Sequence, residues 1–223
     1  MNTKVDYIVV GQGLAGTLVC WMLEERGRKF VVFDQGHAGS SSNIAAGIIN
    51  PVTGRRYVKS WMYDELLPTA LACYSNMEMR LNVTLLRQRN ILRYLPDFKS
   101  ENDWLSKSAK PGYHTYILSR AETEETSQLD LGGMWGEVTN SYQLDIGTLI
   151  SSYRRHLREK SLLREQVFDS ELLLKCRDTQ TIYGLSFERI VFCEGHLVSN
   201  NRLFASDFLN PSKGEVLILR IPG

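Results

Sequence analysis

The pattern of apolar and polar positions is most regular over the first 34 residues of the chain. Residues 6–10 (DYIVV) and 30–33 (FVVF) are short apolar runs with the length of buried strands. Between them, apolar side chains recur at the spacing of a helix that lies on a sheet, at Leu14, Leu18, Val19, Met22 and Leu23. A strand, a helix and a second strand in this order predict the start of a parallel α/β sheet.

Further along, the pattern predicts more helices and a set of short strands. Helical spacing predicts helices over residues 63–81, 97–108 and 145–160. Because proline is tolerated in the first turn of a helix, Pro68 indicates that the first of these helices begins closer to Leu67. Extended patterns predict strands at residues 84–86, 90–95, 113–117, 136–138, 142–144, 166–168, 172–174, 181–183, 187–192 and 216–220. The strands of the middle region have antiparallel character.

The junction between the first strand and the first helix carries a glycine pattern, residues 11–16 (GQGLAG). Gly11 allows a sharp turn, Gly13 allows the backbone to approach a pyrophosphate, and Gly16 allows the helix to lie close to the sheet. The N-terminus of the helix offers N–H groups and a positive dipole to phosphates. Asp34 lies 23 residues after Gly11, where an acidic residue accepts hydrogen bonds from an adenosine ribose. Together these features predict a dinucleotide site.

The segment that follows, residues 35–54, departs from an ordinary nicotinamide-binding unit. Such a unit continues with another helix and a third parallel strand, whereas this segment is rich in glycine and serine. It surrounds a small apolar patch at residues 44–49, which is expected to be buried. A loop of this length is usually functional or disordered, and the apolar patch favours function. We therefore expect it to line the cofactor.

Composition and charge narrow the class of protein. Hydrophobic residues make up 43% and charged residues 23% of the 223 residues, as in an ordinary globular protein. The net charge of +1 gives no general attraction to nucleic acid or anionic membranes, so no nucleic acid partner is expected. No apolar run approaches the roughly 18 residues of a membrane span, and the first strand begins too early for a signal peptide. A cytoplasmic protein is expected.

Two groups of side chains have simple structural explanations. The four cysteines are widely spaced, which disfavours zinc or thioredoxin-like chemistry, and Cys20 and Cys193 are expected to be small buried hydrophobes. A basic cluster near the end of the third long helix is better explained by the negative end of the helix dipole than by nucleic acid. The cluster comprises Arg154, Arg155, His156, Arg158 and Lys160.

Two further motifs follow near the end of the chain. An apolar run leads into a second strand-to-glycine turn at residues 193–195 (CEG), and residues 211–215 (PSKGE) turn into another apolar run. With the glycine loop, Asp34 and the serine-rich segment 40–48, these motifs stand in the order found in the flavin-dependent amino acid and amine oxidases. This is the family of D-amino acid oxidase, glycine oxidase and sarcosine oxidase, and the chain resembles it over its whole length.

The resemblance implies FAD as the cofactor. The serine-rich segment would lie beside the flavin, the backbone of Val167 would meet the adenine, and the 193–195 turn would approach from the other side of the sheet. The residues expected to bind the cofactor are Gly11, Gln12, Gly13, Leu14, Ala15, Gly16, Asp34, Gln35, Ser41, Ser42, Ala45, Ala46, Gly47, Ile48, Val167, Cys193, Glu194 and Gly195.

The resemblance also implies a division into domains. Residues 1–81 and 143–208 would form a Rossmann-like FAD-binding domain, and residues 82–142 and 209–223 an incomplete antiparallel α+β substrate domain. Family members continue well past this point with further strands of the substrate domain. The chain is therefore expected to be the N-terminal part of a longer protein.

The activity implied by the resemblance is oxidation of a C–N bond in a small amino acid or secondary amine, with hydride transfer to flavin N5. Because the flavin carries this chemistry, no catalytic side chain and no metal site are assigned. Arg55 and Arg56 follow the flavin-facing segment. They would either steer a substrate carboxylate or form salt bridges with Asp64 or Glu65.

Several alternatives stay open at this point. A related flavoprotein could act on a hydroxy acid or a modified nucleic acid base, and a truncated chain could be inactive, holding at most the adenosine half of FAD. A nicotinamide dehydrogenase is less compatible with the sequence of residues 35–54. Apolar surface left exposed by a missing half could also drive the formation of a homo-oligomer.

Overall fold

The computed structural model describes residues 3–36, 39–119, 134–175, 181–204, 211, 212 and 214. Contacts between Cα atoms divide the chain into two compact units. The first unit comprises residues 1–45 and 146–223, and the second comprises residues 46–145.

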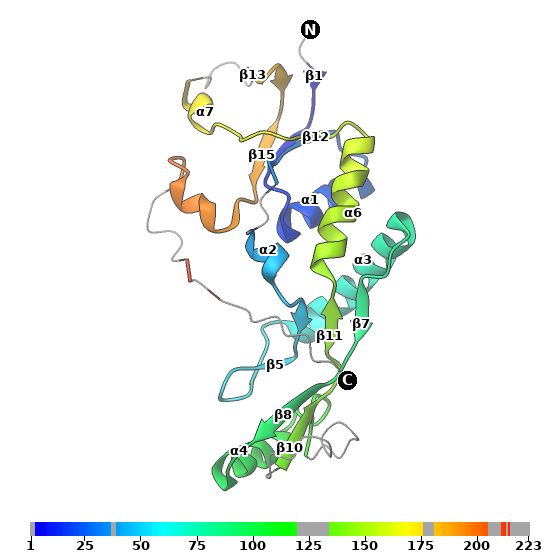
Figure 1. Ribbon diagram of the computed structural model, residues 1–223, viewed down its shortest axis with the longest axis vertical. Coiled ribbons are helices and arrows are strands. Elements are labelled where there is room, and N and C mark those ends of the chain that lie inside the picture. Colours follow the sequence, from blue (N-terminus) through cyan, green and yellow to red (C-terminus); the bar gives the residue numbers. More distant parts are fainter. Residues whose placement is uncertain are drawn as a thin grey trace, which may run out of the picture. The chain divides into compact units, whose positions relative to one another are not determined.

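A four-stranded parallel sheet forms the centre of the first unit, in the order β12-β3-β2-β15 (Figure 1). Its strands are β2 (Tyr7–Val10), β3 (Phe30–Phe33), β12 (Leu163–Arg164) and β15 (Arg189–Phe192). Each neighbouring pair runs parallel. The apolar runs of β2 and β3 are buried because helices and loops cover the sheet, as is usual for parallel strands. The strands predicted at residues 6–10 and 30–33 are confirmed.

Two helices of the first unit lie side by side, α1 (Leu14–Glu25) and α6 (Ile146–Glu159) (Figure 1). Helix α1 follows β2 directly and contacts both β2 and β3. Helix α6 buries one apolar face, and Tyr153 on this face meets Trp21 of α1 edge to face with ring centroids 6.4 Å apart. The apolar residues of this face are all buried, namely Ile146, Leu149, Ile150, Tyr153 and Leu157.

A small three-stranded sheet completes the first unit, in the order β1-β14-β13. Its strands are β1 (Thr3–Lys4), β14 (Leu185–Ser186) and β13 (Thr181–Ile182). Its core joins that of the parallel sheet through Phe33, whose ring centroid lies 5.2 Å from that of Phe168. This packing brings the segment after β12 against the end of β3.

Two strand predictions in this unit are wrong. Residues 172–174 lie in a short helix, α7 (Glu171–Lys175), because a short run of leucines suits a helix as well as a strand. The Asp169 side chain accepts a hydrogen bond of 2.9 Å from the Glu171 N–H at the start of this helix, a local bond that favours a helix start. Residues 166–168 have no regular structure, since the strand ends earlier, at Arg164.

The sheets of the second unit are antiparallel, as expected. One has the order β4-β11-β7, another β8-β10-β9, and β5 pairs with β6. The strands are β4 (Ile48–Ile49), β5 (Val52–Thr53), β6 (Val58–Lys59), β7 (Leu86–Gln88), β8 (Ile91–Leu95), β9 (Ile117–Leu118), β10 (Met134–Val138) and β11 (Tyr142–Leu144). The helices are α3 (Tyr63–Leu81) and α4 (Phe98–Ser108).

Several boundaries in the second unit differ from expectation. The strand predicted at residues 84–86 is shifted to β7, and the strand predicted at 136–138 begins earlier, as β10. Helix α3 begins at Tyr63 rather than near Leu67, with Pro68 inside it. Its first turn is complete before the proline, since the Leu66 N–H donates to the Met62 carbonyl at 2.9 Å, and Pro68 removes only one donor. The strand expected at 113–117 is reduced to β9, because turn hydrogen bonds occupy the backbone before it.

The expected domain limits differ from the compact units in three segments. Residues 143–145, expected in the FAD-binding domain, belong to the second unit, and residues 209–223, expected in the substrate domain, belong to the first. Residues 46–81, assigned to the FAD-binding domain from the sequence, group by contacts with residues 82–145. Which of the two functional domains they serve stays a prediction. The run expected at 216–220, and Lys213 and Glu215 of the PSKGE motif, lie outside the described residues. Among the described helices, none is long and apolar enough to cross a membrane.

Candidate functional site

The glycine loop lies where the carboxyl end of β2 meets the start of α1 and the end of β15. Gly11 has a φ of +95°, and a Cβ placed on it would lie 2.4 Å from the carbonyl oxygen of Cys193. A Cβ on Gly16 would lie 1.9 Å from the carbonyl oxygen of Gly11. Both distances are far inside van der Waals contact, so only glycine fits at either position. The backbone here is packed as a dinucleotide loop requires.

The N-terminus of α1 is covered by a serine from the following loop. Helix α2 (Ser41–Ile44) places Ser42 so that its Oγ accepts a hydrogen bond of 3.1 Å from the Leu14 N–H. A Cβ on Gly13 would lie 3.0 Å from the same Oγ. The residue that caps α1, Gly13, contributes no side chain. A hydroxyl and the positive end of a twelve-residue helix therefore meet at one point, which is suited to a phosphate oxygen.

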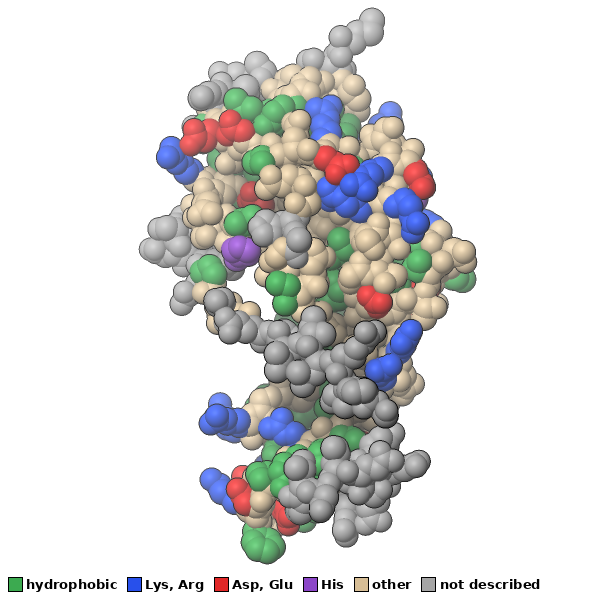
Figure 2. Space-filling model, in the orientation of Figure 1, with side chains coloured by type: hydrophobic (Ala, Val, Ile, Leu, Met, Phe, Trp, Pro, Cys, Tyr) green, Lys and Arg blue, Asp and Glu red, His purple; other side chains and the backbone are tan. Residues whose placement is uncertain are grey.

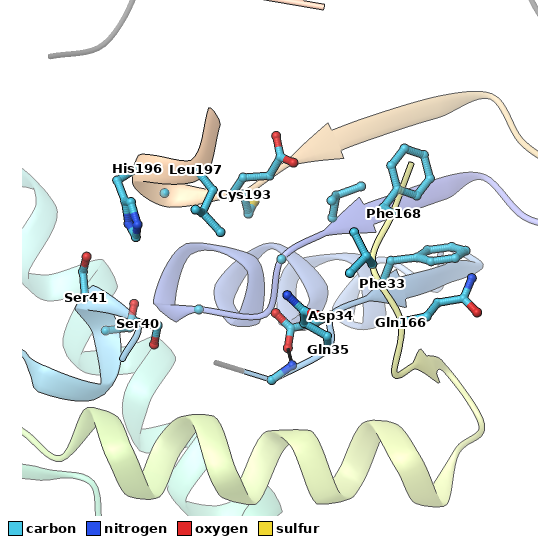
Figure 3. Close-up of a pocket in the computed structure, with 18 residues that line it drawn as sticks. Phe33, Asp34, Gln35, Ser40, Ser41, Gln166, Phe168, Cys193, His196 and Leu197 are labelled. Atoms are coloured by element: carbon cyan, nitrogen blue, oxygen red, sulfur yellow. Dashed lines mark hydrogen bonds between the residues drawn. The ribbon is translucent and has the colours of Figure 1, made fainter. Parts of the chain in front are cut away.

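Asp34 directly follows β3, and its carboxylate is held by three donors. Oδ2 accepts from the Gln12 N–H at 2.8 Å, while Oδ1 accepts from the Gly36 N–H at 2.7 Å and from Arg154 Nη1 at 2.6 Å. Figure 3 shows the bond from Gly36 as a dashed line. A carboxylate offers about four acceptor positions. The described bonds fill both positions on Oδ1 and leave one on Oδ2.

These elements border a cavity of about 180 Å³ at the carboxyl ends of the parallel strands. In Figure 3, Cys193, His196 and Leu197 lie on one side of it, across from Asp34 and Gln35. Ten of the residues expected to bind a cofactor line the cavity, namely Gly11, Gly13, Asp34, Gln35, Ser41, Ser42, Val167, Cys193, Glu194 and Gly195. Open parallel sheets bind ligands at this edge.

Other lining residues were missed in the sequence. They are Val10, Phe33, Gly36, Ser40, Gln166, Phe168, His196 and Leu197. Most of them are immediate neighbours of expected residues, so extending each motif by one or two positions would have found them. His196 and Leu197 belong to a 3-10 helix, Gly195–Asn200, that begins at the predicted glycine turn.

Four of the expected residues near the loop have other surroundings. The Gln12 side chain is buried away from the cavity, where its Nε2 donates to Thr17 Oγ1 at 3.0 Å and to the Ile150 carbonyl at 3.2 Å. Leu14, Ala15 and Gly16 form the first turn of α1 and do not line this cavity.

The apolar segment after α2 also lies outside the lining of this cavity, including Ala45, Ala46, Gly47 and Ile48. A Cβ on Gly47 would lie 1.9 Å from the Leu144 carbonyl oxygen, so this glycine is explained by packing within the second unit. The expected burial of the patch is wrong: of its six residues, Ile44, Ala45, Ala46 and Ile48 are exposed, and the other two are half-buried. Ile44 is 49% exposed and Ile48 is 59% exposed. Their contact with a flavin stays a prediction.

The thiols beside the glycine loop are uncharged. Burial, with a smaller contribution from Glu194, raises the pKa of Cys193 above its usual value. Burial raises the pKa of Cys20 still further, and this side chain is fully buried. Cys20 is the small buried hydrophobe that was expected, whereas Cys193 is only half-buried and borders the cavity. Among the described residues, no group of three or more His, Cys, Asp or Glu side chains is placed to hold a metal ion.

The residues present fit the adenosine and pyrophosphate half of a dinucleotide. The close packing at Gly11 and Gly16 holds the start of α1 against the strand ends, and the α1 N-terminus with Ser42 suits the phosphates. Asp34 keeps one acceptor position for a ribose hydroxyl. Phe168 and the backbone beside it provide an apolar wall for a base.

Comparison with solved structures shows that this fold is similar to that of several enzymes. Glycine oxidase from Geobacillus kaustophilus superposes with a TM-score of 0.62 at 16% identity, over 89% of this chain and 57% of that one. L-amino acid deaminase from Proteus vulgaris, lacking its specific insertion, gives 0.59 at 17% identity, over 92% and 56%. L-proline dehydrogenase from P. horikoshii gives 0.52 at 14% identity, over 74% and 45%. At such identities the likeness shows the fold alone.

The chain spans between 38% and 57% of the length of these solved relatives and of a second Proteus deaminase. A family model described as FAD dependent oxidoreductase matches residues 6–223, nearly the whole chain. This match confirms the resemblance inferred from the motifs. The chain belongs to the FAD-dependent oxidoreductase family.

Proposed function

We propose that the chain binds FAD and forms part of an enzyme that oxidises a C–N bond in a small amino acid or secondary amine. The observation that carries the proposal is the cavity at the carboxyl ends of β2, β3 and β15, lined by the glycine loop, Ser42 and Asp34. Membership of the FAD-dependent oxidoreductase family supports it. So do the names of the solved relatives, which refer to glycine, proline and amino acids.

In this proposal the chain's own residues bind and orient the cofactor. The α1 N-terminus and Ser42 hold the pyrophosphate, Asp34 accepts from the ribose, and the wall formed by Phe168 covers the adenine. When bound, the flavin supplies the two-electron acceptor that takes a hydride from the substrate carbon. The protein's role is then orientation and exclusion of water, and no side chain of this chain is assigned to proton transfer.

Recognition of the substrate carboxylate is proposed for Arg55 and Arg56. The alternative, a salt bridge with Asp64 or Glu65, is not found in the part of the chain that the structure describes, where Asp64 hydrogen bonds to Lys59 and to Tyr116. Both arginines are exposed in the turn between β5 and β6, and no ion pair to them is found among the described residues. Exposed guanidinium groups are available for a bidentate bond to a carboxylate.

The proposal is tested on the whole protein by its visible spectrum. The purified protein is expected to show a flavin band after addition of FAD and desalting. Under anaerobic conditions the band is expected to bleach with amino acids or secondary amines, but not with the matching hydroxy acids. Bleaching by hydroxy acids alone would contradict the substrate class, and a protein that retains no flavin would contradict the proposal as a whole.

Changing Asp34 to asparagine is expected to weaken FAD binding about 10- to 100-fold, since a charge-assisted hydrogen bond contributes about 1.5–3 kcal/mol. An amide also places an N–H₂ group opposite donors that the carboxylate now satisfies. Equilibrium titration of flavin fluorescence measures the change. The control is Asp97→Asn in the second unit, where asparagine caps α4 as well as aspartate does. Equal affinity in the native protein and Asp34→Asn would exclude Asp34 from the site.

A further inference from the structure

We propose that Arg154 is the positioning residue of the dinucleotide site, holding the Asp34 carboxylate so that one oxygen is presented to a ribose hydroxyl. This inference rests on the proposed binding of FAD. It concerns a residue of α6 that lies 120 positions from Asp34 in the sequence and that no motif assigns to the site.

The contacts of Arg154 converge on Asp34 and on Gln12, the residue whose N–H also holds the Asp34 carboxylate. Nη1 donates to Asp34 Oδ1 at 2.6 Å and to Gln12 Oε1 at 3.1 Å. Nη2 donates to the Asp34 carbonyl oxygen at 2.9 Å and to Glu165 Oε2 at 3.2 Å. The guanidinium group therefore bonds to both the main chain and the side chain of Asp34, which fixes the rotation of the carboxylate.

Arg154 reaches Asp34 from behind the candidate cofactor cavity. Asp34 borders this cavity and also a second cavity of about 210 Å³, whereas Arg154 borders only the second. The Arg154 side chain is 13% exposed. It is thus placed to act on a ligand through Asp34 rather than by contact with it.

The hydrogen bonds leave Asp34 one defined acceptor position. Arg154 and the Gly36 N–H occupy Oδ1, and the Gln12 N–H occupies one position on Oδ2. Gln12 is itself anchored by Arg154 and by the Ile150 carbonyl, also on α6. The network therefore joins the glycine loop, the ribose acid and α6 into one rigid group, and a hydroxyl donor can add to it only at Oδ2.

The positive and negative side chains around Asp34 are equal in number. Arg154 and Arg158 are offset by Asp34 and Glu165, which accepts from Arg158 at 2.7 and 2.9 Å. Hydrogen bonds from Arg158 and Arg154 lower the pKa of Glu165 to about 2, so it stays charged at neutral pH. An arginine paired in this way has no charge left for a ribose phosphate. The arrangement suits a ribose with free hydroxyls.

The experiment measures whether Arg154 acts on the ribose hydroxyls specifically. Binding of ADP and of 2′,3′-dideoxy-ADP to the 223-residue chain is measured by calorimetry for the native protein and for Arg154→Met. In the native protein the dideoxy ligand is expected to bind about tenfold more weakly, as for one lost charge-assisted bond. For Arg154→Met, the affinity for ADP is expected to fall about tenfold. The affinity for the dideoxy ligand is expected to change by less than about twofold.

Two variants separate positioning from a merely structural role. Like Arg154→Met, Arg158→Met removes one positive charge from α6 and one ion pair with Glu165. Unlike Arg154→Met, it removes no bond to Asp34. This variant is expected to bind both ligands with affinities within about twofold of those of the native protein. Arg154→Lys restores the charge but not the fork of donors, and is expected to recover part of the preference for ADP. It also serves as the test if Arg154→Met fails to fold.

The other outcomes would overturn the proposed role of Arg154, the proposed binding of FAD, or both. Equal weakening of both ligands by Arg154→Met, or by Arg154→Lys where that variant serves, would mean that Arg154 only supports the fold. Equal binding of ADP and its dideoxy analogue by the native chain would overturn the role of Arg154 while the binding of FAD stands. A native chain that binds neither ADP nor FAD would overturn both proposals.

Discussion

Replacing Gly16 with alanine is expected to lower the free energy of unfolding by about 2 kcal/mol, since overpacking at the upper end of its usual range of about 1–3 kcal/mol outweighs the gain in helix propensity. Two effects of opposite sign compete. Alanine is the better helix former by about 1 kcal/mol, which on its own would stabilise α1. The added Cβ, however, would lie 1.9 Å from the Gly11 carbonyl oxygen, against about 3.3 Å for an ordinary close C···O contact. The Cβ is fixed to the helix backbone and the carbonyl oxygen belongs to the loop backbone, so neither atom can rotate away. The helix and the loop must therefore move apart.

Urea denaturation followed by circular dichroism measures this change. The control is Gly27→Ala, just beyond the end of α1, where φ is +61° and nothing lies within 4 Å of the added Cβ. The control is expected to lose only about 1 kcal/mol, the cost of a left-handed backbone for alanine. If Gly16→Ala were as stable as native, the close packing of α1 on the glycine loop would be refuted.

The sequence predicted the parts of the site that are determined by local geometry. The glycine loop between β2 and α1, and Asp34 at the end of β3, follow from residues close together in the chain. Each requirement acts within one turn or one strand end. A φ of +95° at Gly11 and the close contact at Gly16 are met by glycine alone, so these positions can be recognised without the rest of the fold.

The partner of Asp34 could not be predicted in this way. Arg154 lies in a basic cluster whose composition suits the end of any helix. Only the folded chain shows that four of its members pair with carboxylates. Arg154 pairs with Asp34 and Glu165, Arg158 pairs with Glu165, and His156 and Lys160 pair with Glu24. On the visible face of the first unit, basic and acidic side chains accordingly lie beside one another (Figure 2). The cluster therefore gives no argument for nucleic acid.

The errors in secondary structure have a related cause. Short apolar runs such as residues 172–174 carry no period that separates helix from strand, and tertiary contacts decide. The apolar patch at 44–49 was expected to be buried because of its composition, yet Ile44 and Ile48 are about half exposed or more. Apolar composition indicates that burial of a segment would be favourable, whereas the neighbours of the segment in the fold determine how much of it is exposed.

Changing Glu24 to glutamine is expected to lower the free energy of unfolding by about 2 kcal/mol at neutral pH. Breaking a buried ion pair costs about 3–5 kcal/mol, and one partner here, Lys160, is half exposed, which reduces the cost. The Glu24 side chain is only 8% exposed. It accepts from Tyr153 Oη at 2.7 Å, from His156 Nε2 at 3.0 Å and from Lys160 Nζ at 3.1 Å. These bonds join α1 to α6.

The loss is expected to depend on pH in one direction. Burial would raise the pKa of Glu24, but the hydrogen bonds from Tyr153, His156 and Lys160 outweigh it, and the pKa is lowered. A lowered pKa in the folded state stabilises the fold above the unfolded value of about 4.3, and this contribution is lost as the pH falls through the folded value. Below that value native Glu24 is protonated and resembles glutamine. The difference between native and Glu24→Gln is therefore expected to shrink on acidification.

Urea denaturation of both proteins at a series of pH values between about 7 and 3 tests this dependence, since linkage ties its slope to proton binding by the two states. The matched control is Glu25→Gln, the next residue of α1, which is exposed and is expected to change stability by less than about 0.5 kcal/mol. A difference for Glu24→Gln that stays constant with pH would mean that the contacts of Glu24 act by packing alone. A difference that shrinks identifies the charge of Glu24 as a link between α1 and α6, the helix that carries Arg154.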